Sequence, residues 1–258
     1  MEAAGRVGYA FKGVLYVLLG VLAVDAALGG GEAEGQRGAL QTVAEGAFGS
    51  VLLTVLALGL AAYALWRLAM AALDPEREGT DASGIAHRVG YVVSGVSYGL
   101  LAFAAYRILQ GGGEGGGNGA EQGAQAALSL PGGRIVLGLI ALAVLGFGAY
   151  ELVRAHKKNF MDKLALSGEA ARHRETVQRL GTAGLVARGV VYLVIGSALA
   201  VAAYRYDAGQ AKGLDEALAT LRDQPYGAVL LGLIGLGLAA YGLYCGINAR
   251  YRRFEGAQ

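Results

Sequence analysis

The sequence predicts an all-α membrane protein in which six transmembrane helices form three parallel helical-hairpin repeats. Three observations support this fold class. Hydrophobic residues make up 55% of the 258 residues and charged residues only 16%, against about 25% charged in a typical soluble domain. Six stretches are long enough to cross a bilayer, which takes about 20 mostly apolar residues, and helices satisfy their own backbone there. An internal repeat divides these stretches into three pairs.

Each span is placed by its apolar run and by the charged or glycine-rich residues that bound it. The predicted spans are 9–28, 50–73, 91–109, 135–153, 185–204 and 228–248. The first could alternatively be a cleavable signal peptide, because Lys12 precedes an apolar run and small residues. The repeat argues against cleavage, since a removed leader would have no reason to match two internal helices.

The repeat is clearest at the first span of each pair, where a glycine is followed three residues later by a tyrosine. These pairs are Gly13 and Tyr16, Gly95 and Tyr98, and Gly189 and Tyr192. The second spans share a glycine four residues before a tyrosine, and these tyrosines are Tyr63, Tyr150 and Tyr241. Copy 2 has about three extra residues before that glycine, so its second helix is predicted to be one turn longer or differently entered. The copies occupy 1–82, 83–168 and 169–258.

Two spans per copy make all three copies face the same way across the membrane. Parallel repeats are related by an axis along the membrane normal, so a pseudo-threefold six-helix bundle is expected, with copies in a row as the alternative. Of the 22 Lys and Arg residues, 16 lie on the side of the termini and 6 on the other side. Basic residues near span ends stay cytoplasmic. Both termini are therefore expected in the cytoplasm.

The first copy also resembles a known family. It reads RxGYAxKGVxY from Arg6, GALQT from Gly38 and GLAAY from Gly59. This pattern is similar to the tandem repeat of bacterial membrane proteins called the domain of unknown function 1206 family, in three copies over nearly the whole chain. Copy 2 departs most, with Ser94 in place of the basic residue. The resemblance implies a six-span protein of the bacterial inner (plasma) membrane, and no particular activity.

The repeated glycines and tyrosines have two interpretations. Positions i, i+3 and i+7 share one helix face, and small residues there let a neighbouring helix come close. On this view all six repeated tyrosines are packing residues. Alternatively, Tyr16, Tyr98 and Tyr192 converge on the axis and line a site. The tyrosines of the second helices, Tyr63, Tyr150 and Tyr241, are expected to pack.

Lys12 and Arg188 share one repeat position, with Ser94 as its third member. Ionisable groups inside spans are costly, by about 3 kcal/mol on insertion scales. The two cations could snorkel to lipid headgroups. They could instead point inward and, with the tyrosines, form an axial site for an anion or a carboxylate.

Two other charged pairs are expected. Asp25 and Arg107 share a repeat position and could pair at the outer end of the bundle, or remain solvated separately. Glu151 and Arg154 lie one turn apart and form an ordinary i,i+3 pair. Glu151 has no charged counterpart in the other copies, since Ala64 and Gly242 stand at its position, and a proton-relay role resting on this one residue is the alternative.

The segments between the spans carry two further patterns. Leu214, Leu218 and Leu221 are spaced as on a short amphipathic helix at the outer interface. The basic segment 155–182 could attract anionic lipid headgroups or dock a cytoplasmic partner. It lacks the interleaved aromatic residues expected for nucleic-acid binding.

No catalytic or cofactor motif is present in the sequence. The three histidines have no metal-ligand spacing, Cys245 is the single cysteine, and no nucleophile stands near a base. The protein is therefore expected to be neither an enzyme nor a metal or cofactor protein. Two functions remain: a conduit or binding site for a small ion or solute near the axis, and a membrane scaffold or regulatory subunit. The sequence predicts no particular solute, physiological partner or oligomeric state.

Overall fold

The computed structural model describes residues 2–30, 35–46, 48–74, 82–111 and 119–252, and its regular elements are helical. Six helices there are long and apolar enough to cross a membrane. They are α1 (Glu2–Ala27), α3 (Gly49–Leu73), α4 (Ala82–Leu109), α6 (Gly133–Lys157), α8 (Arg174–Arg205) and α10 (Gly227–Tyr251). The predicted all-α, six-span fold is confirmed. Many exposed leucines and valines cover these helices, as expected of a surface in contact with lipid.

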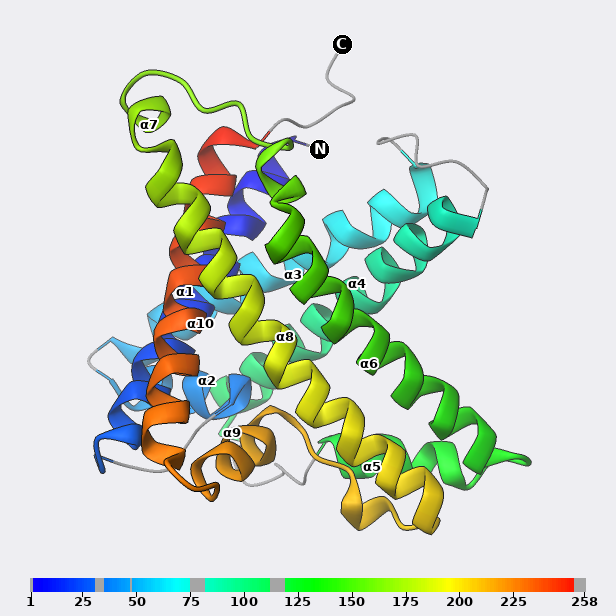
Figure 1. The fold of residues 1–258 in the computed structure, drawn as a ribbon. Helices are drawn as coiled ribbons and strands as arrows, with labels where there is room; N and C mark the ends of the chain where they lie inside the picture. The colour runs from blue at the N-terminus through cyan, green and yellow to red at the C-terminus, as the bar shows by residue number, and fades with distance from the viewer. Residues whose placement is uncertain (1, 31–34, 47, 75–81, 112–118, 253–258) are drawn as a thin grey trace.

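Short helices join the two long helices of each copy. They are α2 (Gln36–Glu45), α5 (Gly119–Leu128) and α9 (Leu214–Arg222), and they lie at the end of the bundle away from the start of α1 and the end of α10 (Figure 1). In α9 the predicted amphipathic pattern is present, with Leu218 and Leu221 buried. The remaining elements are η1 (Asn159–Met161), α7 (Glu169–Arg172) and η2 (Ala208–Gln210).

The second helix of each copy begins in the same way. The residues preceding α3, α6 and α10 are Phe48, Gly132 and Tyr226, and all three have positive φ, at 62°, 73° and 62°. The residue after each is a glycine whose Cβ would collide with the carbonyl oxygen of the preceding short helix. This shared turn requires the same backbone conformation in all three copies.

The second helix of copy 2 is not longer than the others. All three second helices contain 25 residues. In α6, Tyr150 lies three residues further from the start of the helix than Tyr63 and Tyr241 do in theirs. The helix compensates by ending three residues sooner after its tyrosine, at Lys157. The prediction of one additional turn is therefore wrong, and so is the alternative of a different entry, because α6 begins with the same turn as α3 and α10.

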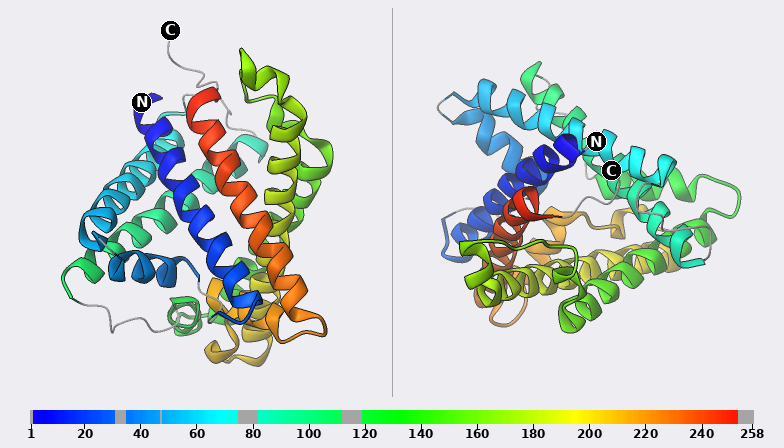
Figure 2. Two further views of the ribbon diagram at one scale, coloured as in Figure 1. Left: turned by 90° about the vertical axis from the view of Figure 1, so that its left-hand side faces the viewer. Right: turned by 90° about the horizontal axis from the view of Figure 1, so that it is seen from above.

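The tightest helix pairs join neighbouring copies. These pairs are α3 with α4, α6 with α8, and α10 with α1. In each, the second helix of one copy packs against the first helix of the next, and the α10–α1 pair joins copy 3 to copy 1. The α3–α4 and α6–α8 pairs lie on opposite sides of the α1–α10 pair (Figure 2).

Within copies the contacts are unequal. The α1–α3 and α8–α10 contacts are substantial, whereas in the described part of the chain α4 and α6 form no contact of comparable extent. The three tight pairs follow one another in the cyclic order that a threefold bundle requires. The unequal contacts within copies, however, depart from threefold symmetry. The pseudo-threefold arrangement stays a prediction.

The repeated glycines lie where the paired helices approach most closely. A Cβ on Gly13 would lie 2.8 Å from the Gly242 carbonyl oxygen, and one on Gly95 would lie 3.1 Å from that of Ala64. A Cβ on Gly189 would lie 3.1 Å from the Gly148 carbonyl oxygen. Small residues thus bring the backbones of neighbouring copies together.

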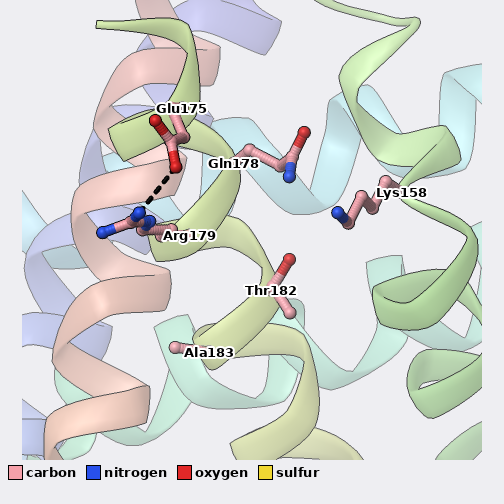
Figure 3. Close-up of a pocket in the computed structure, with 6 residues that line it drawn as sticks. All are labelled: Lys158, Glu175, Gln178, Arg179, Thr182 and Ala183. Carbon is pink, nitrogen blue, oxygen red and sulfur yellow. Dashed lines mark hydrogen bonds and ion pairs between the residues drawn. The ribbon is translucent and has the colours of Figure 1, made fainter.

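The segment between α6 and α8 borders an open pocket of about 410 Å³ (Figure 3). Its lining residues are Lys158, Glu175, Gln178, Arg179, Thr182 and Ala183. Arg179 donates to Glu175 at 2.6 Å, and both side chains are exposed. Phe160 anchors the segment, because its carbonyl oxygen accepts a hydrogen bond from the Tyr244 hydroxyl of α10 at 3.2 Å.

Candidate ion-binding site

Two charged side chains from the repeated cationic position lie inside the bundle. Lys12 of α1 is 4% exposed and Arg188 of α8 is 6% exposed. They point inward rather than towards the lipid headgroups, so snorkelling does not describe them. Both lie over the rings of Tyr16 and Tyr241, on α1 and α10, and each repels the other's charge.

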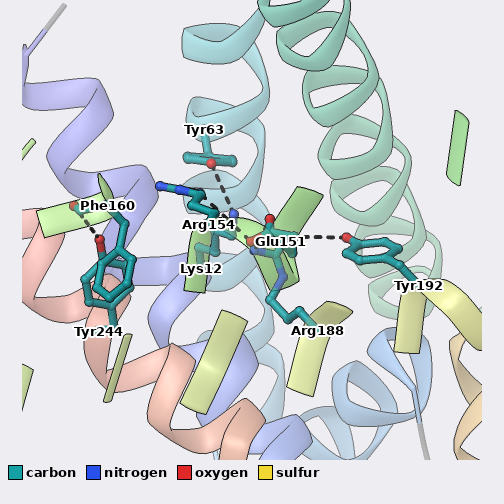
Figure 4. Close-up of polar contacts among 8 residues, drawn as sticks. All are labelled: Lys12, Tyr63, Glu151, Arg154, Phe160, Arg188, Tyr192 and Tyr244. Carbon is teal, nitrogen blue, oxygen red and sulfur yellow. Dashed lines mark hydrogen bonds and ion pairs between the residues drawn. The ribbon is translucent and has the colours of Figure 1, made fainter. Parts of the chain in front are cut away.

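Lys12 is surrounded by tyrosines. Its Nζ lies between 5.2 and 5.9 Å from the ring centroids of four of them, Tyr16, Tyr63, Tyr98 and Tyr241. It also donates to the Tyr63 hydroxyl at 3.3 Å (Figure 4). Each ring within about 6 Å attracts the ammonium through its quadrupole. No carboxylate forms an ion pair with Lys12 in the described ranges.

Arg188 differs from Lys12 in having an acidic partner. Its Nη1 donates to Glu151 Oε1 of α6 at 3.2 Å, and its Nη2 donates to the Tyr192 hydroxyl at 3.3 Å. Its guanidinium carbon lies 4.3 Å from the Tyr241 ring centroid. Its Nε, however, is buried and has no hydrogen-bond partner among the residues that the structure places.

Glu151 is 1% exposed and lies between two arginines. Its Oε2 is 3.9 Å from Arg154 Nη1, so the predicted i,i+3 ion pair is present at long range. The shorter contact, to Arg188, crosses from copy 2 to copy 3. Glu151 therefore neutralises a buried cation of the next copy.

A third cation borders the tyrosines. Arg67 Nε donates to the Tyr63 hydroxyl at 2.9 Å, so that hydroxyl accepts from Lys12 as well as Arg67. The Arg67 guanidinium carbon lies 5.0 Å from the ring of Trp66 and 5.2 Å from that of Tyr91. We define the axial cluster as Lys12, Arg67, Glu151 and Arg188 with Tyr16, Tyr63, Tyr98, Tyr192 and Tyr241.

The three first-helix tyrosines all border this cluster. Tyr16 and Tyr98 share the ammonium of Lys12. Tyr192 lies beside Arg188 and packs edge-on against Phe147, with ring centroids 4.9 Å apart. Tyr16 also lies over Arg188. The two cations thus connect equivalent tyrosines of all three copies, although a role for them on an axis stays a prediction.

The second-helix tyrosines are not equivalent in the structure. Tyr63 and Tyr241 are buried and contact Lys12, so they contribute to the axial cluster as well as to packing. Tyr150 is 48% exposed. The expectation that it packs like the other two is not met, because α6 turns Gly148 and Glu151 towards α8 instead.

Asp25 and Arg107 are not brought together. Both side chains are exposed, and within the residues covered by the structure they share no ion pair. Their helices, α1 and α4, each pack on α3. The solvated alternative fits this placement better than the predicted outer pair.

Sequence reasoning missed the contact between Arg188 and Glu151 and the part played by Arg67. A signal for the first was available, since Glu151 is an acid inside a span and needs a buried cation. The partner could not be chosen without knowing that α6 packs against α8 of the next copy. In the described chain, no group of three His, Cys, Asp or Glu side chains could hold a metal ion.

These features define a class of protein: a multi-pass helical membrane protein built from a tandem repeat, with a charged and aromatic cluster inside the bundle. The family described as Domain of Unknown Function (DUF1206) matches three times, at residues 7–74, 89–158 and 183–252. The chain therefore belongs to this family. It is also 33% identical over 248 residues to the uncharacterized protein YxxB of Bacillus subtilis (strain 168), covering 96% of this chain and 90% of that relative. No solved structure matches the chain.

Proposed function

We propose that this membrane protein is a non-enzymatic binding site or conduit for a small ion, with the axial cluster as its site. The observation that carries the proposal is the burial of two like charges, Lys12 and Arg188, over the same tyrosine rings. Burying charge within a bilayer is costly, and among the described residues Lys12 has no ion pair to offset that cost. Apolar residues could pack the helices together without that cost. Binding of a charged ligand would explain why charged residues occupy these positions instead.

The distribution of charge supports a particular orientation in the membrane. Basic residues concentrate at the end of the bundle that carries the start of α1 and the end of α10. We place that end in the cytoplasm of a bacterium, with the spans in its inner membrane. An ion entering from this end would meet Lys12 and Arg188 within the first few turns of α1 and α8.

The proposal is tested by ion flux in liposomes containing the purified protein. Potassium, proton and halide gradients are applied separately to wild type and to the Lys12→Gln and Tyr16→Phe variants. We expect flux above protein-free liposomes for the wild type and reduced flux for both variants, because each removes a group that faces the site. Lys157→Gln, an exposed lysine at the end of α6, is the matched control and should behave as wild type.

A second candidate function is a membrane scaffold or regulatory subunit. It is supported by the open pocket beside α8 and by the exposed basic residues that line it, Lys158 and Arg179. Such a surface would attract anionic lipid headgroups or an acidic partner. Absence of flux for every ion, with folded protein, would overturn the conduit, and absence of ion binding as well would leave this second candidate.

A further inference from the structure

We infer that the ligand of the axial cluster is a small anion bound at Lys12, where it supplies the negative charge that Glu151 supplies at Arg188. This inference rests on the proposed function and names the charge of the ion. It is drawn from a comparison of the three copies with one another, because each repeats the same contact between a second helix and the next first helix.

The compared positions are the cationic position of each first helix and the Glu151 position of each second helix. At the α6–α8 pair, Arg188 faces Glu151, and the two charges cancel. At the α3–α4 pair, the residues are Ser94 and Ala64, so neither is charged. At the α10–α1 pair, Lys12 is matched by Gly242, and its charge has no counterpart. At these two positions, one of the three junctions therefore carries an unbalanced charge.

No acidic side chain could be accommodated at Gly242. A Cβ there would lie 2.6 Å from the Gly13 carbonyl oxygen and 2.6 Å from the Val17 nitrogen. Both are backbone atoms, so α1 and α10 would have to separate. Close packing of α1 against α10 therefore excludes a carboxylate side chain at this junction. A small anion from solution could neutralise Lys12 without separating the two helices.

The neighbouring groups are suited to hold an anion. The ammonium has three N–H donors, and among the described residues it has one hydrogen-bond acceptor, the Tyr63 hydroxyl. Arg188 Nε is a second buried donor without a partner among the described residues, on a side chain that is 6% exposed. Arg67 and Arg188 both repel the charge of Lys12, and Glu151 is the single carboxylate of the axial cluster as defined above. A bound anion would relieve that repulsion.

Equilibrium dialysis of radiolabelled iodide against the purified protein in detergent tests the inference. We expect saturable binding of one iodide per chain, displaced by chloride and nitrate but unaffected by exchanging sodium for caesium. Lys12→Gln should weaken binding about 10- to 100-fold, as expected for loss of a charged hydrogen bond. Lys157→Gln should bind as the wild type does.

A gain of affinity gives a test that misfolding cannot imitate. Glu151→Gln removes the internal anion that competes for Arg188, so iodide should bind several-fold more tightly. Unchanged or weaker binding in this variant, or equal binding in Lys12→Gln and wild type, would overturn the inference. So would the absence of saturable iodide binding.

Failure of the inference can be told from failure of the proposed function. Cluster-dependent flux of potassium or protons, without iodide binding, would retain a conduit and reject the anion. Saturable iodide binding without flux would retain the anion site and reject the conduit.

Discussion

Replacing Glu151 with leucine is expected to destabilise the protein by about 3–5 kcal/mol, because Arg188 then remains buried without its ion-pair partner. The substitution removes the 3.2 Å hydrogen bond that Arg188 Nη1 donates to Glu151 Oε1, deep inside the bundle. The free energy of unfolding in detergent micelles is the quantity to measure, in buffer of low halide concentration.

Two controls separate this effect from a general response to mutation. Glu175→Leu removes an ion pair of similar chemistry, but both of its side chains are about three-quarters exposed, so a change of only about 0–1 kcal/mol is expected. The double variant Glu151→Leu with Arg188→Met should recover most of the stability, since no unpaired charge is then buried. A single Glu151→Leu variant as stable as the Glu175→Leu control would contradict the assignment of Glu151 as the counterion of Arg188.

Replacing Gly242 with alanine is expected to cost about 1–3 kcal/mol, the range for overpacking a closely packed contact. The added Cβ would meet the backbone of α1 at Gly13 and Val17, and backbone atoms cannot move aside as a flexible side chain can. Because Gly13 follows Lys12 directly, separation of the helices should also weaken iodide binding.

Gly246 provides the matched control for this substitution. It lies one turn further along α10, and a Cβ there has open space. Gly246→Ala should change stability by less than about 0.5 kcal/mol. Equal effects of the two substitutions on unfolding would show that the approach of α1 to α10 is not the close contact described here.

The fold was predictable because membrane spans and tandem repeats leave strong local signals. Apolar length alone places the six long helices, and the glycine at each first helix predicts one closely packed face. The glycine pattern does not predict which other helix packs against that face. Gly13 and Gly242 are distant in the chain, and their contact emerges only once copy 3 is seen to pack against copy 1.

The site was only partly predictable for the same reason. Lys12, Arg188 and the first-helix tyrosines are recognisable as a repeated set, and in the structure each of these tyrosines contacts one or both of the two cations. The role of Glu151 depends on its neighbour across a copy boundary. Tyr150 shows the opposite case, in which a sequence match does not give the same environment. It aligns with Tyr63 and Tyr241 but lies three residues further from the start of its helix, and its side chain is exposed.

Anomalous diffraction from crystals grown in bromide would show whether an anion neutralises Lys12, because it locates the anion without assuming that it is transported. We expect a bromide peak within ion-pair distance of Lys12 Nζ in the wild type and its loss in Lys12→Gln. A bromide-free cluster in crystals that hold bromide elsewhere, with Lys12 still enclosed by its four tyrosines, would contradict the anion site.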